Sequence, residues 1–384
     1  MLTNILIRKV PIFDAFSGKY STPQDILVSN GIVAEISPDI PAQAGWEIIQ
    51  APGLLASAGW TDCHTHLDDF DPFLTYPSLG ATCIHDAGSY GAFTYERIHN
   101  VIARLPFPAT TYLYVGCWGV TGNGHDELVT LDNLKPEPFY EVAQQYTGEI
   151  IGAKIRIDPR VNSDTKKTLR QAKDVAVHAG LPLIVHPSRC GDSLAEILDV
   201  LEKDDVYAHT YSPVAPTLFD EDGKIKQCAW DAMKRGVRFD LSHGSNNFSY
   251  DIARRAIAQG FLVETISTDM HSKNFTRPGI SLPGVMTKAV HAGFTVEDAL
   301  KRVITAPVGL LHIKGKQCSI EVGKPADITL YHVREEERDL PDSMGNIETC
   351  TTQIETAAVI IGPALHRAAG VGCQSVNYWP PYQV

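Results

Sequence analysis

From about residue 54 to residue 313, short apolar runs alternate with longer stretches whose apolar positions recur with a helical period. Short apolar runs predict buried strands, and the longer period predicts amphipathic helices. The candidate strands are Ala81–His85, Thr111–Cys117, Ile150–Ile157, Pro182–His186, Val206–His209, Val237–Leu241 and Leu262–Thr268, with an eighth leading from the run Leu54–Ala58 into His64. The candidate helices include Asp164–Ala179, Ser193–Lys203, Trp230–Lys234 and Ser249–Gln259. Eight strands that alternate with helices imply parallel βαβ units and predict a (β/α)8 TIM barrel.

Both ends of the chain have strand-like patterns. Asp25–Val28 and Ile32–Ile36 flank Asn30-Gly31, and Asn-Gly between two apolar runs indicates a hairpin. Lys324–Leu330 and Ala357–Ile361 are strand-like near the other end. We therefore expect 1–53 and 314–384 to form one small β-sandwich domain beside a barrel of 54–313. From Val371 onward we expect a poorly packed tail.

Composition narrows the class of protein. The 384 residues are 44% hydrophobic and 20% charged, which is typical of globular proteins. A formal net charge of −12 argues against non-specific nucleic-acid binding, which needs a basic surface. The eight cysteines include no C-x-x-C pair, so we expect reduced thiols. Because no signal-peptide pattern and no long apolar run are present, we expect a cytoplasmic protein without a membrane span, and we leave a homo-oligomer open.

Polar side chains recur where the predicted strands end. Side chains two apart on a strand point the same way, so His64 and His66 lie on one face and can hold one metal ion. Asp62 shares that face and is a candidate supporting partner. The other polar groups near strand ends are Lys154, His186, His209 and Asp269. In a barrel the carboxyl ends of the strands face one volume, so the six residues predict a shared metal site.

This set of residues, His64-x-His66, Lys154, His186, His209 and Asp269, resembles the amidohydrolase superfamily of metal-dependent hydrolases. Local strings are similar to its amidohydrolase/deacetylase branch, a relative of dihydroorotase. They are Ala208-His209-Thr210-Tyr211-Ser212, Phe219–Ile225, Phe239–Ser245 and Ile266–His271.

The resemblance implies a binuclear centre bridged by a carbamate that carbon dioxide forms on Lys154. It implies that His64, His66 and Asp269 hold one ion and that His186 and His209 hold the other. A hydroxide between the ions would be the nucleophile, and Asp269 would act as general base and then as general acid. Zinc is the expected metal, although nitrogen and oxygen ligands also accept manganese, iron or cobalt.

The branch suggests deacetylation of N-acetyl amino acids or O-acetyl hydroxy acids, so we expect a small substrate that bears a carboxylate. Arg156, on the face of Lys154, and His243 are the candidate substrate contacts. Arg189, His271, Lys273, Asn274 and Arg277 also follow strands and could line the pocket, but most loop charges of this kind are only solvated.

Three alternatives remain. Cyclic-amide hydrolysis, as in dihydroorotase or hydantoinase, uses a similar centre. A catalytically silent scaffold related to dihydropyrimidinase is less consistent with a complete ligand set. Deamination is disfavoured because the residues after His186 are Pro187-Ser188-Arg189-Cys190, with no glutamate before Glu196.

Overall fold

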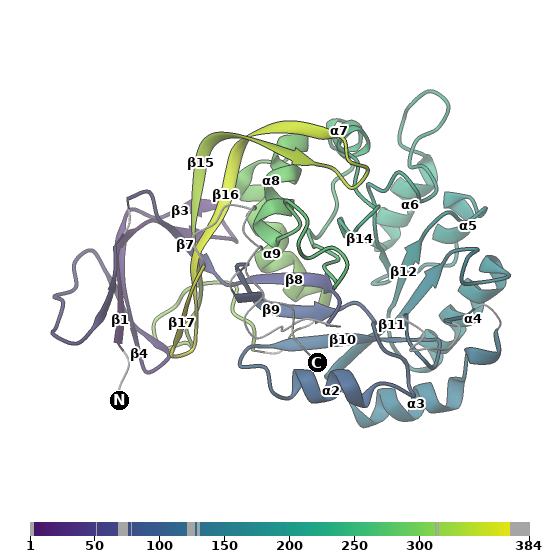
Figure 1. Ribbon diagram of the computed structural model, residues 1–384, viewed down its shortest axis with the longest axis horizontal. Coiled ribbons are helices and arrows are strands. Elements are labelled where there is room, and N and C mark those ends of the chain that lie inside the picture. The colour runs from purple at the N-terminus through teal and green to yellow at the C-terminus, as the bar shows by residue number, and fades with distance from the viewer. Residues whose placement is uncertain are drawn as a thin grey trace.

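The computed structural model describes residues 4–50, 52–67, 76–77, 79–120, 127–128, 131–311, 313 and 315–368. The chain forms a barrel and a smaller β domain built from both chain ends (Figure 1). The tail predicted from Val371 onward lies outside the described residues. No helix in the described part of the chain is both long enough and apolar enough to cross a membrane.

The barrel wall is a parallel sheet with the strand order β14-β13-β12-β11-β10-β9-β8. Its strands are β8 (Trp60–Thr65), β9 (Ala81–Asp86), β10 (Ala109–Tyr114), β11 (Ile150–Ile157), β12 (Leu183–Pro187), β13 (Val206–Tyr207) and β14 (Arg238–Phe239). Neighbours in this order are also neighbours in the sequence, as expected for consecutive βαβ units. The seven strands follow the apolar runs that the sequence analysis identified.

The segment 264–270 closes the barrel between the two edge strands. Thr265 bridges in parallel to Asp240, and Met270 bridges in parallel to Thr65. The amide of Asp269 also donates to the carbonyl of His64 at 2.7 Å. The segment is not a regular strand, because side-chain oxygens accept some of the hydrogen bonds that a neighbouring strand would otherwise accept. The amide of Met270, for example, donates to Oγ1 of Thr268 at 3.0 Å. The predicted (β/α)8 barrel is therefore confirmed.

Helices cover the outside of the barrel (Figure 1). They are α2 (Glu96–Ile102), α3 (Pro136–Gln145), α4 (Thr165–His178), α5 (Leu194–Leu198), α6 (Gln227–Arg235), α7 (Tyr250–Ala258), α8 (Leu282–Ala292) and α9 (Val296–Leu311), with a short 3-10 helix at Leu131–Asn133. Helix α4 begins after Asp164, whose carboxylate caps it by accepting from the amide of Lys167. Helix α5 ends at Leu198, five residues before the predicted Lys203, and the carboxylate of Asp205 then accepts from the amide of Glu202 in the following turn.

Two sheets from the chain ends form the β domain. One has the order β5-β4-β1-β6 and the other β17-β16-β15-β7-β2-β3. Their strands are β1 (Asn4–Val10), β2 (Ile12–Asp14), β3 (Lys19–Tyr20), β4 (Gln24–Ser29), β5 (Ile32–Ser37), β6 (Glu47–Ile49), β7 (Leu55–Ala58), β15 (Asp327–Pro341), β16 (Ile347–Ile361) and β17 (Ala364–Arg367). Residues from both ends share one apolar core, including Ile7, Val28, Ile328 and Ile360. The β-sandwich built from both chain ends is confirmed.

Two details of the β domain bear on the sequence analysis. Asn30 and Gly31 both have positive φ, +52° and +80°, as the two-residue hairpin between β4 and β5 requires. Strand β7, taken as the run that leads into the barrel, pairs instead with β15 and β2 of the β domain, and the first barrel strand begins at Trp60.

The long hairpin of β15 and β16 reaches from the β domain across α8 (Figure 1). The amide of Ile354 in β16 donates to Oγ1 of Thr287 in α8 at 3.0 Å. Near the turn of the hairpin, the hydroxyl of Ser343 donates to the carbonyl of Phe248 at 2.8 Å. Phe248 follows directly on residues 245–247, which line the cavity described below, so the hairpin helps to fix the cavity wall.

Candidate metal centre

The six residues that the sequence predicts for a metal site lie at one end of the barrel. His64 is in β8 and His66 follows it, Lys154 is in β11, and His186 is in β12. His209 follows β13, and Asp269 is in the closing segment 264–270. These are the carboxyl ends of the strands, where TIM-barrel enzymes place their active sites.

Short distances join these side chains into one cluster. Nε2 of His209 lies 2.9 Å from Nδ1 of His186. Nε2 of His66 lies 3.2 Å from Oδ1 of Asp269, and Nζ of Lys154 lies 3.4 Å from Nε2 of His64. One potential ligand atom each from His64, His209 and Asp269 falls within 4.8 Å of the others. The structure therefore brings all six residues together.

Hydrogen bonds turn the imidazoles of His209 and His66 toward the cluster. Nδ1 of His209 donates to the carbonyl of Ser242 at 2.7 Å. Nδ1 of His66 donates at 2.7 Å to Oγ of Ser89, whose own proton goes to Asp86. Each bond fixes the orientation of its ring, so that Nε2 faces the other site residues.

His64 is held in the same way by Asp240 and Ser242, which the sequence analysis did not assign. Nδ1 of His64 lies 3.0 Å from Oγ of Ser242 and 3.3 Å from Oδ2 of Asp240. Ser242 donates its proton to Asp240, so the imidazole N–H points to these two oxygens. The string Phe239–Ser245 was visible in the sequence, but its order does not show that Asp240 reaches His64.

Asp62, the predicted supporting partner, holds the residue next to Asp269. Its carboxylate accepts from Oγ1 of Thr268 at 2.6 Å and from the amide of Thr268 at 3.1 Å. These bonds fix the residue that precedes Asp269. Burial raises the pKa of Asp62 to about 7.

Two cluster residues have backbone conformations that are costly for side chains other than glycine. His209 has φ of +60° and Asp269 has φ of +48°. Such strain costs about 1–3 kcal/mol per residue and persists where function requires it. Here the left-handed turns directly after a barrel strand direct the side chains into the cluster.

Burial sets the protonation of the nitrogen donors. Burial and the neighbouring Lys154 keep the pKa of His64 well below its usual value, and burial lowers the pKa of His209 to about 4. Burial and the neighbouring His209 also keep the pKa of His186 well below normal. These imidazoles are therefore neutral near pH 7, which is the form that binds a metal ion.

Asp269 and Lys154 have shifted pKa values that also fit a cation site. Burial would raise the pKa of Asp269, but the hydrogen bond to His66 and the nearby His209 outweigh it and lower the pKa to about 2. Burial lowers the pKa of Lys154 to about 8, against the opposing charges of Asp269 and Asp86. An ionised carboxylate and the neutral imidazoles of His64, His186 and His209 are donors that divalent cations take, and a lysine whose pKa is lowered loses its proton more readily.

Gly88 makes room for the stem of Lys154. It has φ of +89°, and a Cβ built on it would lie 2.4 Å from Cβ of Lys154. A larger residue at this position would displace the lysine, so a glycine here is required by both backbone conformation and space.

Asp240→Asn is expected to weaken metal binding about 10- to 100-fold, the usual effect of removing a partner that orients a ligating histidine. The side chain keeps its shape but loses the charge that faces His64. Competition with a chromogenic chelator measures the affinity, and thermal unfolding checks the fold. An unchanged affinity in a folded variant would contradict the orienting role.

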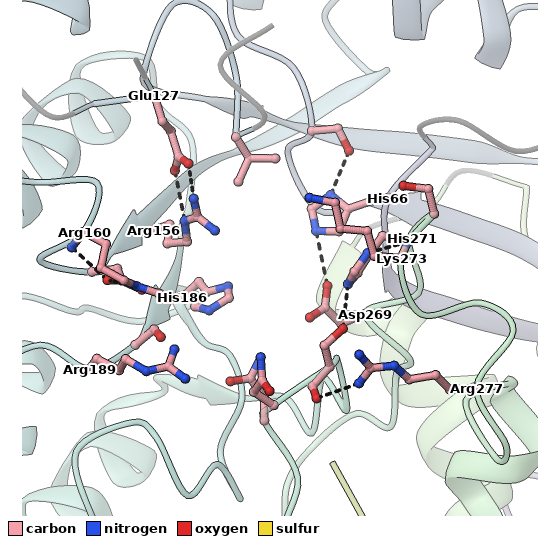
Figure 2. A pocket seen from close by; sticks show the side chains of 18 residues that line it. His66, Glu127, Arg156, Arg160, His186, Arg189, Asp269, His271, Lys273 and Arg277 are labelled. Atoms are coloured by element: carbon pink, nitrogen blue, oxygen red, sulfur yellow. Dashed lines mark hydrogen bonds and ion pairs between the residues drawn. The ribbon is translucent and has the colours of Figure 1, made fainter. Parts of the chain in front are cut away.

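A cavity of about 750 Å³ opens beside the cluster (Figure 2). Figure 2 shows His186 on one wall and His66 and Asp269 on the opposite wall.

The two predicted substrate contacts differ in position. Arg156 lines the cavity but pairs with Glu127, and its Nε donates to Oε1 at 3.1 Å. His243, the other predicted contact, is not among the described residues that line the cavity. It is buried between Phe248 and Lys288, with Nε2 3.0 Å from Nζ of Lys288.

Known structures share the whole architecture. A crystal structure of a dihydroorotase superposes with a TM-score of 0.85 at 24% identity, covering 95% of this chain and 98% of that chain. A crystal structure of an adenine deaminase superposes with a TM-score of 0.82 at 27% identity, covering 95% and 100%. These likenesses show the fold of TIM-barrel hydrolases, and the cluster of His64, His209 and Asp269 at the mouth of the barrel supports a metal-dependent hydrolase.

Sequence comparisons agree with the structural likeness. A family profile described as a deacetylase-like composite domain matches residues 320–366. A deacetylase of Enterococcus faecalis is 29% identical over 354 residues, which cover 90% of this chain and 95% of that protein. These comparisons support the resemblance to the amidohydrolase superfamily that the sequence predicts.

Proposed function

We propose that this protein is a binuclear metal-dependent hydrolase that deacetylates N-acetyl amino acids or O-acetyl hydroxy acids. The observation that carries the proposal is the convergence of four histidines, Asp269 and the buried Lys154 beside an open cavity. The likeness to a deacetylase along nearly the whole chain supports the choice of reaction.

In this proposal His64, His66 and Asp269 would hold one divalent cation, and His186 and His209 would hold the other. Lys154 would join the two sites as a carbamate, which forms when its neutral amine adds carbon dioxide and loses a proton. Bound divalent cations, with zinc expected, supply Lewis acidity and lower the pKa of water to about 7.

The residues of the chain itself then position and move the proton. Asp269 lines the cavity, and its low pKa keeps it ionised near neutral pH. It can therefore accept a proton from the attacking water on a carboxylate oxygen and return it to the departing amine or alcohol. The imidazole N–H of His66 is committed to Ser89, so this ring keeps one orientation while the proton moves.

A substrate panel separates the proposed reaction from its rivals. We expect the purified protein to hydrolyse N-acetyl amino acids or O-acetyl hydroxy acids, and we expect a strong chelator to remove the activity until a divalent metal is restored. Dihydroorotate and a hydantoin serve as cyclic substrates in the same assay. Turnover of the cyclic compounds alone would contradict the proposal.

Cyclic-amide hydrolysis is the second candidate, because the dihydroorotase structure shares the fold over 95% of this chain. Deamination has less support from the site. Glu196, the first glutamate after His186, caps α5 with Ser193 and pairs with Lys166 at an exposed position. It does not line the cavity, so in the described residues this glutamate is not placed to act on a substrate.

A further inference from the structure

The cavity beside the metal cluster carries more positive than negative side chains. Among the described residues that line it are five lysines and arginines and three acidic residues. The whole chain, in contrast, has a formal net charge of −12. A positively charged cleft concentrates anionic ligands, even in a molecule whose net charge is negative.

Two of the arginines in the cavity wall already have carboxylate partners. Arg156 pairs with Glu127, and Arg160 pairs with Asp158, its Nε donating to Oδ1 at 2.9 Å. A guanidinium that is neutralised by a neighbouring carboxylate attracts an incoming anion weakly. Arg156, which the sequence favoured as the substrate contact, is therefore less suited to that role than its position suggests.

Arg189 and Arg277 are different. In the described residues neither guanidinium has a carboxylate partner. Arg277 donates from Nη1 to the carbonyl of Ser245 at 3.1 Å, which fixes its direction and leaves its other N–H groups available. Figure 2 shows Arg189 and Arg277 directed toward one another from opposite sides of the cavity.

The backbone at Arg189 is also strained. Its φ is +48°, and its amide donates to the carbonyl of Val214 at 2.8 Å. Arg189 follows His186 by three residues in the loop after β12, and Arg277 follows Asp269 by eight residues. Each arginine thus follows closely on a residue of the metal cluster, so the distance from each guanidinium to the cluster is limited by a short segment of chain.

We propose that Arg189 and Arg277 together bind the carboxylate of the substrate, with Lys273 adding positive charge at the same mouth. This inference rests on the proposed function. The substrate would be an acylated amino or hydroxy acid with its acyl group at the metal cluster, and the two arginines would bind its carboxylate. Guanidinium groups form paired N–H···O bonds with carboxylates, which gives direction as well as attraction.

The expected size of the effect follows from the bonds that are lost. Both arginines are exposed, so solvent partly screens the hydrogen bonds that each would form with a carboxylate. Arg189→Gln and Arg277→Gln should each lower kcat/KM for a carboxylate substrate about 10-fold, mainly through KM. The double variant should lose about 100-fold.

The test compares an N-acetyl amino acid with its uncharged carboxamide in the wild type and in the variants. Arg170→Gln is the matched control, because Arg170 is exposed on α4, does not line the cavity and changes the net charge equally. The wild type should prefer the carboxylate, the arginine variants should lose that preference, and the control should keep it. Equal loss on both substrates, or no loss on either, would overturn the assignment.

Binding to the chelated protein keeps this test separate from the proposed function. Isothermal titration of the same two compounds into metal-depleted protein measures recognition without turnover. If no acyl compound is hydrolysed but the carboxylate still binds more tightly than the carboxamide through Arg189 and Arg277, the proposed function fails and the anion site stands. Equal binding of both compounds in the wild type would overturn the anion site itself.

Discussion

Asp269→Asn is expected to lower kcat/KM by about 10²- to 10⁴-fold, the usual contribution of a general acid–base group, with a larger loss if metal is released as well. The change keeps the size of the side chain and removes the charge that faces His66 at 3.2 Å and His209 at 3.9 Å. Steady-state kinetics at saturating metal measure the loss, and circular dichroism checks that the barrel remains folded. Mouth residues contribute chemistry more than core packing, so the fold should persist.

Asp174→Asn is the control for this experiment. Asp174 is exposed on α4 and makes the same change in charge away from the cavity. His186→Ala should behave like Asp269→Asn, since it removes a nitrogen that lies 2.9 Å from His209. Wild-type turnover in Asp269→Asn or His186→Ala would show that the assigned roles are wrong.

Lys154→Ala is expected to reduce activity by more than about 100-fold, because it would remove a group that joins both ion sites. Loss of a residue that only orients a ligand usually costs about 10- to 100-fold. Short carboxylic acids such as formate, acetate and propionate should restore part of the activity. Their two oxygens can take the place of the carbamate in the space that the lysine stem leaves beside Gly88. The measurement is the rate as a function of added acid, which should rise and saturate.

Lys154→Met separates rescue from a general salt effect. Methionine fills much of the space of the lysine stem without an amine, so it should lose activity and gain little from added acid. Full activity of Lys154→Ala without any acid would exclude the carbamate bridge. Equal rescue of the alanine and methionine variants would show that the acids act elsewhere.

The features that depend on regular patterns could be predicted from the sequence. Alternating apolar runs and helical stretches predict the barrel. Parallel strands place their carboxyl ends together, so Lys154, His186 and Asp269 can be predicted to share one site without knowledge of distances. Where a boundary depends on contacts between distant residues, pattern alone fails. Leu55–Ala58 is as apolar as a barrel strand, yet it pairs with residues 328–331 of β15, at least 270 positions later in the chain.

The partners of the site residues show the same limit. Arg156 lines the cavity, but the sequence does not show that Glu127, 29 residues earlier, pairs with it. His243 was singled out for its chemistry, whereas Asp240, three residues earlier, is the group that orients His64. Side chains at strand ends can be anticipated, but their direction depends on turns such as the left-handed ones at His209 and Asp269.

The central claim is that six side chains, distant in sequence, hold two cations at the mouth of the barrel. Anomalous diffraction from crystals of the metal-loaded protein, recorded on both sides of the metal absorption edge, tests it directly. We predict two peaks, one beside His64, His66 and Asp269 and one beside His186 and His209, with metal–nitrogen distances of about 2.0–2.1 Å if the metal is zinc. Density without a peak among these residues, or peaks only elsewhere on the protein, would contradict the account.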